Sequence, residues 1–338
     1  MELNAQERLE VGQVIELVIG PVAHGGHFVA RHNGQVIFVR HGITNELVKI
    51  KITAVSSKIA HADVIEVLTA APSRVSAPCQ YAGKCGGCDF QHIDLLTQRK
   101  LKAEIIKEQF MRIGKIDLPA LGFNLEVIEV EPSDGLHWRT RMDFAVSPNG
   151  KIGFFGARSN EVVEISQCLI ADERMNVSEL AARNWKSDAR VEVAVSSTSE
   201  VSVMRSGRSI SGPTQIVEQV GGNSFKISPE AFWQSHKSAP VTLVKAALAQ
   251  LGVKSNDHVC DLYSGVGLFA AAILKELGEQ GFITLIESDK SAVADARKVF
   301  LNKSNVKILG GLVAQQLPIV KRADLVLLDP PRTGAGEV

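Results

Sequence analysis

Residues 257–269 read Asp-His-Val-Cys-Asp-Leu-Tyr-Ser-Gly-Val-Gly-Leu-Phe. The apolar residues at 259–262 predict a short buried strand, and the apolar run at 268–277 predicts a helix that starts directly after the turn. The turn contains Gly265 and Gly267, whose missing Cβ atoms let the backbone lie close to a ligand, while the free N–H groups of the new helix face the same crevice. A tight turn with no ligand would use the same two glycines. The residues at the ends of the neighbouring strands therefore have to distinguish a ligand-binding turn from a merely tight one.

Acidic residues follow the strands that are predicted after this turn. A second strand at 282–286 is followed by Glu287, roughly 20 residues or more after Asp261, where a doubly wound sheet carries the carboxylate that holds the ribose hydroxyls. A later strand at 325–328 is followed by Asp329. Because the carboxyl ends of parallel strands meet at one edge, we expect the three carboxylates to lie close together.

This edge favours one class of ligand. Three acids would repel a pyrophosphate, whereas they suit a ligand with hydroxyls, an amino group and a positive charge. We therefore expect S-adenosylmethionine rather than NAD in the crevice. With a further strand expected at 306–309, the C-terminal third of the chain is predicted to be a Rossmann-like α/β domain.

The composition sets limits for the whole chain, which has 338 residues, 45% of them hydrophobic, and a formal net charge of zero. Such a length predicts two to three globular domains, and the balanced charge gives no support for a strongly basic nucleic-acid binder, although a local positive groove stays compatible with it. The first ten residues are polar and charged, and no apolar run is long enough for a membrane span. We expect a cytoplasmic protein without membrane contact.

Residues 11–68 alternate between apolar and polar side chains in several short runs, and an Asn33-Gly34 pair marks a hairpin turn. Several strands in so short a stretch predict a small β-barrel of the oligonucleotide-binding type. The stretch resembles a TRAM domain, a small RNA-binding barrel, most clearly at residues 25–34 with Phe38 and Val39 following. A docking or stabilising module without RNA contact is the alternative.

Three of the five cysteines lie within ten residues, at Cys79, Cys85 and Cys88. The glycines between them let the chain wrap sharply, and thiolates gathered in this way are ligands of zinc and iron–sulfur sites. A fourth ligand has to come from elsewhere, and Cys168 is the available candidate, whereas Cys260 is expected in the core of a strand. The spacing leaves zinc and iron–sulfur open, and buried free thiols are the alternative.

Between the cysteines and the C-terminal domain, the sequence predicts a mixed α+β region. Helical periodicity covers 95–113, and a turn at 148–150 separates runs with strand periodicity. Arg139 and Arg141 lie two apart on an expected strand and point to the same side, where they could hold RNA phosphates or form an ordinary solvated edge. The expected strands are 125–130, 141–146, 151–155, 161–165 and one or two within 191–204.

Residues 227–236 read Ile-Ser-Pro-Glu-Ala-Phe-Trp-Gln-Ser-His and come just before a predicted helix at 239–251. With the barrel, the cysteine pattern, the glycine turn and the Asp-Pro-Pro-Arg run that begins at Asp329, this order resembles the RNA uracil-C5-methyltransferase family. The likeness is greatest to the ribosomal branch that has a TRAM domain and a [4Fe-4S] cluster, and it spans nearly the whole chain. It implies a TRAM-like RNA-binding barrel at 1–70, an α+β central domain with the cysteine cluster at 71–225, and a partial methyltransferase domain at 226–338.

The resemblance also implies cofactors, a partner and roles for single residues. The implied cofactors are S-adenosylmethionine and a [4Fe-4S] cluster. The implied partner is RNA, ribosomal rather than transfer RNA. We expect the protein to be a monomer. The residues implied for the cluster are Cys79, Cys85, Cys88 and Cys168. Those expected around the S-adenosylmethionine site are Gln234, Tyr263, Glu287 and Asp329, with Gly265, Gly267 and Asp261 at the glycine turn.

In this family a cysteine thiolate adds to C6 of the target uracil, which makes C5 nucleophilic, and a base later removes the C5 proton. Both groups follow the Asp-Pro-Pro motif in the family, whereas the given sequence ends at Val338. We therefore expect a truncated family member that has no catalytic residue and does not methylate alone. The alternatives are a transfer RNA methyltransferase, a non-catalytic iron–sulfur RNA-binding protein and a methyltransferase that acts on an amino group.

Overall fold

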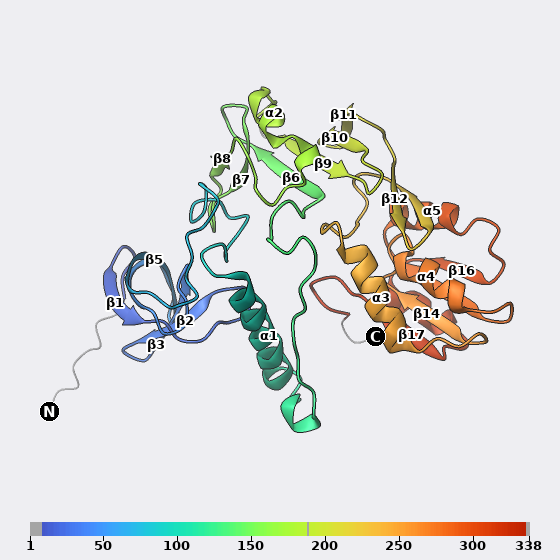
Figure 1. Cartoon of the computed structure of the whole chain (residues 1–338), viewed down its shortest axis with the longest axis horizontal. Coiled ribbons are helices and arrows are strands. Elements are labelled where there is room, and N and C mark those ends of the chain that lie inside the picture. The colour runs from blue at the N-terminus through green and yellow to red at the C-terminus, as the bar shows by residue number, and fades with distance from the viewer. Residues whose placement is uncertain (1–8, 188, 336–338) are drawn as a thin grey trace. The chain divides into compact units, whose positions relative to one another are not determined.

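The structure is a computed structural model that describes residues 9–187 and 189–335. The chain divides into two compact units, residues 1–129 with 154–163 and residues 130–153 with 164–338. Figure 1 shows the helices and strands, coloured from blue at the N-terminus to red at the C-terminus. In the part of the chain that is described, no helix is both long and apolar enough to cross a membrane.

The first unit begins with a five-stranded sheet in the order β1-β4-β5-β3-β2. Asn33 and Gly34 both have positive φ angles and form the predicted hairpin turn between β2 and β3, which confirms that expectation. Register shifts between β4 and β5 bend the sheet around an apolar core, in which Phe28 and Ile37 are fully buried. The strands are β1 (Val14–Val18), β2 (Phe28–His32), β3 (Gln35–Arg40), β4 (Leu47–Val55) and β5 (Ile59–Thr69).

A buried ion pair fastens the chain that leaves this sheet. The carboxylate of Glu46, which is fully buried, accepts hydrogen bonds of 2.6 Å from two nitrogens of Arg74, and further ones from the backbone amides of Ala71 and Ile43. Burial by itself raises the pKa of Glu46, but these hydrogen bonds outweigh it and leave the pKa below its ordinary value. The segment after β5 is therefore held to the sheet by the ion pair of Arg74 with the buried carboxylate of Glu46.

The loop that carries the three clustered cysteines leads into helix α1 (Leu95–Arg112), which confirms the helix predicted at 95–113. Asp94 caps its first turn by accepting a hydrogen bond from the backbone amide of Thr97. A short 3₁₀ turn, η1 (Pro119–Leu121), follows. The strand expected at 125–130 is wrong: these residues form no regular element and none of them is buried, because their apolar side chains have no sheet to pack against.

The second sheet is antiparallel, in the order β11-β10-β9-β6-β7-β8, and the expected strands near 141, 151, 161 and 191–204 are confirmed. A turn at 147–150 joins β6 to β7. Its strands are β6 (Arg141–Val146), β7 (Ile152–Phe155), β8 (Val162–Glu164), β9 (Arg190–Val195), β10 (Val201–Arg205) and β11 (Arg208–Ser211). Between β8 and β9 lie η2 (Glu173–Met175) and α2 (Val177–Ala182).

The C-terminal part of the second unit is an α/β layer. A hairpin of β12 (Ile216–Val220) and β13 (Asn223–Ile227) precedes a parallel sheet in the order β16-β15-β14-β17. Each of the strands β14, β15 and β16 is followed by a crossover that carries a helix and leads to the next parallel strand, which is the predicted Rossmann-like pattern. The elements are α3 (Ala239–Leu251), β14 (His258–Leu262), α4 (Leu268–Glu276), β15 (Phe282–Glu287), α5 (Lys290–Val299), β16 (Val306–Gly310), α6 (Val313–Gln316), η3 (Leu317–Ile319) and β17 (Leu325–Leu328).

Candidate functional site

The strands β14, β15 and β17 end at the same edge of the parallel sheet. Leu262, the last residue of β14, lies opposite Ile286 on one side and Leu328 on the other. Glu287 therefore ends β15 and Asp329 follows β17 at the same level, next to the turn that follows β14. The structure brings the expected carboxylates to one edge.

The two glycines of the turn after β14 have different reasons to be glycine. Gly267 has a φ of +87°, and a Cβ built there would lie 2.4 Å from Cε2 of Phe300, so packing excludes a side chain. Gly265 has a φ of +55°, but a Cβ there would meet no atom within 4 Å among the described residues. Gly267 is thus required by the fold, whereas Gly265 borders open space.

Glu287 is held in place by two backbone amides. Its Oε2 accepts a hydrogen bond of 2.8 Å from the amide of Gly265, and its Oε1 accepts one of 2.7 Å from the amide of Asp289. Asp289 in turn caps helix α5 by accepting a hydrogen bond from the amide of Ala292. The carboxylate of Glu287 therefore has a fixed orientation beside the turn.

Asp261 lies beneath this edge and is completely buried. Burial raises the pKa of Asp261 to about 7, and the negative charges of Asp329 and Glu287 add to the rise. The backbone amide of Ala270 acts in the opposite direction, but neither carboxylate oxygen of Asp261 has a partner of full hydrogen-bond geometry in the described chain. A buried carboxylate without such partners is costly, so the edge favours a cation or a hydrogen-bond donor nearby.

A small cavity of about 40 Å³ lies at the same edge, enough for one group of a larger ligand. Four of the residues expected at the cofactor site line it together, while Glu287 joins it through its hydrogen bond to Gly265. Apart from Ser264, the other residues of the wall are apolar. Of these, Trp233 is buried and packs on Phe225 with 5.3 Å between the ring centres. The four expected residues are Gln234, Tyr263, Gly265 and Asp329.

A second cavity, of about 280 Å³, shares Phe232 and Trp233 with the first. Its lining includes Arg139 and Arg141, the pair that we considered for RNA phosphates. For Arg141 this expectation is wrong, because its Nη1 donates hydrogen bonds to two backbone carbonyls and the side chain is only 12% exposed. Arg139 is half-buried and lies 5.8 Å from the centre of the Trp138 ring.

The clustered cysteines lie in the loop between β5 and α1. The Sγ of Cys85 accepts a hydrogen bond from the amide of Gly87, and burial raises the pKa of this thiol, with a smaller contribution from the charge of Cys79. A Cβ at Gly86 would lie 2.7 Å from the carbonyl oxygen of Phe155, so a side chain is excluded there. Three soft donors in a sharply bent loop are chemically suited to zinc or an iron–sulfur cluster.

No group of three or more His, Cys, Asp or Glu side chains is arranged as a metal site in the residues that the structure describes. Cys168 belongs to the second unit, whereas Cys79, Cys85 and Cys88 belong to the first. None of the five cysteines, all of which are described, forms a disulfide. Cys260 is fully buried, as expected, and burial raises the pKa of its thiol to about 11. The four-cysteine ligand set stays a prediction.

Sequence reasoning gave no signal for Glu218, a buried acid on β12 whose Oε1 lies 4.0 Å from Nη2 of Arg141. Nor did it indicate the stacking of Trp138 on His236, whose ring centres are 5.3 Å apart. Both contacts join parts of the chain that lie far apart in sequence, and no local pattern marks them.

The chain is similar to known proteins in sequence and in fold. A TRAM domain model matches residues 8–65. An uncharacterised RNA methyltransferase of Streptomyces coelicolor is 36% identical over 366 residues, covering 96% of this chain and 80% of that protein. The 23S rRNA (uracil(1939)-C(5))-methyltransferase RlmD of Chromohalobacter salexigens is 27% identical over 375 residues, covering 94% of this chain and 76% of that protein.

Among solved structures, the tRNA (uracil-54, C5)-methyltransferase of Pyrococcus abyssi, in complex with S-adenosyl-L-homocysteine, has a TM-score of 0.67. It is 21% identical, and the match covers 95% of this chain and 84% of that one. The likeness shows that the fold described above is shared over nearly the whole chain.

Proposed function

Because the chain belongs to the RNA methyltransferase family, we propose that it takes the methyl group of S-adenosylmethionine and that the acceptor is carbon 5 of a uridine in RNA. The observation that carries the proposal is the edge at which the amide of Gly265 is bonded to Glu287 while Asp329 lines the adjoining cavity. A positively charged sulfonium with ribose hydroxyls is matched by such carboxylates, whereas a pyrophosphate is not.

Each residue of this edge has a role in the proposal. The fixed carboxylate of Glu287 accepts hydrogen bonds from the ribose hydroxyls. The open space beside Gly265 leaves room for the ligand. Gln234, Asp329 and Tyr263 line the cavity, where they offer the ligand an amide, a carboxylate and an aromatic ring. When bound, S-adenosylmethionine supplies an electrophilic methyl group.

No cysteine described at this edge serves as the nucleophile that uracil methylation needs. Cys260 is the nearest in sequence, but it is fully buried within β14 and its pKa is raised to about 11, so its thiolate is scarcely populated at neutral pH. Its side chain belongs to the core of the sheet.

For the acceptor we propose ribosomal RNA. The support is the Chromohalobacter salexigens relative, which acts on 23S rRNA and aligns over 94% of this chain, together with the TRAM domain at 8–65. Transfer RNA is the second candidate, favoured by the shared fold with the Pyrococcus abyssi enzyme. Binding of both RNAs, measured at one salt concentration, distinguishes the two acceptors.

We also propose that Cys79, Cys85, Cys88 and Cys168 ligate a [4Fe-4S] cluster with a structural role. The sharp bend at Gly86 and the gathering of soft donors support a metal site in the loop, and the sequence likeness supports iron–sulfur rather than zinc. We expect the protein to be a cytoplasmic monomer.

The direct test of the donor site is binding. Titration calorimetry with S-adenosylmethionine and S-adenosylhomocysteine should give one site per chain, and NAD should give none. Binding of NAD with no response to either sulfur compound would refute the proposal.

A further inference from the structure

The cavity at the strand edge owes part of its wall to residues 228–235, which form the first part of the connection from β13 to α3 and belong to neither helix nor strand. This 228–235 segment contains Phe232, Trp233 and Gln234, which all line the cavity. A segment without its own ladder of hydrogen bonds takes its position from the side chains that grip it.

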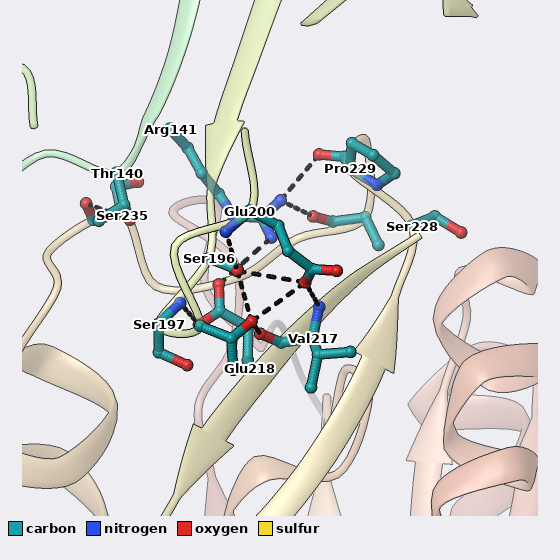
Figure 2. Close-up of polar contacts among 12 residues, drawn as sticks. Thr140, Arg141, Ser196, Ser197, Glu200, Val217, Glu218, Ser228, Pro229 and Ser235 are labelled. Atoms are coloured by element: carbon teal, nitrogen blue, oxygen red, sulfur yellow. Dashed lines mark hydrogen bonds and ion pairs between the residues drawn. The ribbon is translucent and has the colours of Figure 1, made fainter. Parts of the chain in front are cut away.

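Arg141 grips the start of the segment. Its Nη1 donates a hydrogen bond of 2.8 Å to the carbonyl oxygen of Pro229 and one of 2.9 Å to that of Ala231. Figure 2 shows the bond from Arg141 to Pro229. The guanidinium is nearly buried, and although burial lowers the pKa of Arg141 to about 10, it stays charged at neutral pH. These are charge-assisted bonds between a strand of the antiparallel sheet and the segment.

Glu218 faces the same guanidinium from strand β12, with Oε1 4.0 Å from Nη2. Its other oxygen accepts a hydrogen bond of 2.9 Å from the amide of Ser197, in the turn between β9 and β10. The same turn is fastened to β12 through Glu200, which accepts from the amide of Val217 at 2.6 Å. The acid that faces Arg141 is therefore held on a braced strand.

The end of the segment is gripped by the neighbour of Arg141. Thr140 donates to the carbonyl oxygen of Ser235 from its backbone amide at 2.7 Å and from its hydroxyl at 3.1 Å. Two residues further along the chain, the amide of Lys237 donates to the carbonyl oxygen of Trp138. The residues that line the cavity thus lie between two anchors that come from one short stretch of chain.

The contact between Arg141 and Glu218 is poorly suited to stabilising the fold. Within the described chain, Nε and Nη2 of Arg141 and Oε1 of Glu218 have no hydrogen-bond partner, although all three atoms are buried. Both charged groups lose their hydration on burial, and their attraction at 4.0 Å offsets little of that cost. Apolar residues of similar size would therefore stabilise the fold at least as well. A cation is required at this position because it donates hydrogen bonds to the carbonyl oxygens of Pro229 and Ala231.

We propose that Arg141, supported by Glu218, is a positioning residue that sets Trp233 and Gln234 against the methyl donor. The proposal rests on the proposed function, in that the donor has to bind at this edge. It concerns the placement of the wall and assigns Arg141 no contact with the donor.

The experiment separates placement from stability with three variants of the full chain. Arg141→Met removes both bonds to the segment and leaves Glu218 unpaired. The double variant Arg141→Met with Glu218→Leu removes the charge of both partners. Arg190→Met is the matched control, because Arg190 lies in the same sheet and makes an exposed bidentate pair with Asp143. Melting temperature, affinity for S-adenosylhomocysteine and amide hydrogen exchange are measured for each.

Arg141→Met should melt at a lower temperature, bind S-adenosylhomocysteine about tenfold more weakly, and exchange its amides faster at residues 230–235. The double variant should recover most of the lost melting temperature, because the buried charge of Glu218 is gone as well, while its affinity stays low and its exchange stays fast. A structural pair without a positioning role predicts that affinity returns together with the melting temperature, and that result would overturn the proposal. The control should match the wild type in affinity and in the exchange of 230–235.

The two proposals fail in different ways. If the wild type does not bind S-adenosylhomocysteine, the donor site is wrong, while exchange at 230–235 in the ligand-free variants still shows whether Arg141 holds the segment. Unchanged exchange in Arg141→Met refutes the positioning role even when donor binding is intact.

Discussion

The backbone amide of Gly265 donates a hydrogen bond of 2.8 Å to Oε2 of Glu287, and this bond joins the turn after β14 to the end of β15. The two halves of the proposed donor site are therefore connected before any ligand arrives. Glu287 also accepts a hydrogen bond from the amide of Asp289. Its carboxylate is therefore oriented by backbone amides that follow β14 and β15 rather than by solvent. Preorganisation of this kind lowers the cost of binding.

Replacing Glu287 by Gln should weaken binding of S-adenosylmethionine by about tenfold, with little loss of stability. The amide oxygen still accepts one of the two backbone bonds, but the charge that faces the ribose hydroxyls is gone. Isothermal titration calorimetry measures the affinity. Glu276→Gln, at an exposed site at the end of α4, is the control and should bind as the wild type does. Equal affinities of wild type and Glu287→Gln would contradict the role of this carboxylate.

The two glycines of the turn should respond differently to alanine. Gly267→Ala should lower the free energy of unfolding by roughly 2 to 4 kcal/mol, because the new Cβ collides with the ring of Phe300 and the φ of +87° is unfavourable. Gly265→Ala should cost only about 1 to 2 kcal/mol, since its Cβ meets no described atom, but it should greatly reduce donor affinity.

Urea unfolding and donor titration of the two alanine variants give both quantities. Adding Phe300→Leu should recover part of the stability of Gly267→Ala and none of the affinity of Gly265→Ala. Losses of stability that are equal in the two variants would show that the packing described at Gly267 is incorrect.

Asp261 should make the protein less stable as the pH rises. The folded pKa of about 7 lies above the unfolded value of about 4, so the folded state binds more protons between these limits. The contribution of the protonated carboxyl is complete below about pH 4 and is lost by about pH 7. Asp261→Asn, which mimics the protonated form, should therefore be more stable than the wild type at pH 8, by up to ~4 kcal/mol.

Urea unfolding of wild type and Asp261→Asn at several pH values between 4 and 8 checks this prediction. The difference between the two proteins isolates the one carboxyl from all other titrating groups. A constant difference across this range would mean that Asp261 is already ionised in the folded protein.

The buried pair of Arg74 and Glu46 should be essential to the first unit. Arg74→Met leaves a completely buried carboxylate without its cation, and we expect a loss of about 3 to 5 kcal/mol. Denaturant unfolding followed by circular dichroism measures it. Lys49→Met removes the exposed partner of Glu66 in the same sheet and should change stability little. A small effect of Arg74→Met would indicate that Glu46 is neutral in the folded protein.

Protein purified without oxygen should be brown and contain iron and acid-labile sulfide in equal amounts. Cys88→Ser should lose both, whereas Cys260→Ser should keep both, because Cys260 is buried in the parallel sheet. Metal and sulfide analysis of the three proteins decides the matter. A colourless protein that contains zinc would contradict the cluster and leave the thiolate site standing.

The parallel sheet and its acidic edge were predictable from sequence, because apolar runs such as 259–262 end directly in a glycine turn or an acid. The hairpin of β12 and β13 was not predicted, and the strand expected at 125–130 does not form. Local alternation cannot show whether a segment has a sheet to join. The same limit explains why the sequence offered only RNA phosphates or a solvated edge for Arg141: its partners, Pro229 and Ala231, lie about ninety residues further along the chain.

Residues 138–141 have two neighbours at once. On one side Arg141 pairs with Ala194 of β9 and the carbonyl of Thr140 accepts from the amide of Val195, while on the other side the same two residues hold the carbonyls of the 228–235 segment. The position of β6 in its sheet therefore sets the position of the 228–235 segment, which has no regular backbone hydrogen bonding of its own. A slip of β6 by two residues would keep every side chain on its proper face, yet it would displace the wall of the donor cavity by roughly 7 Å.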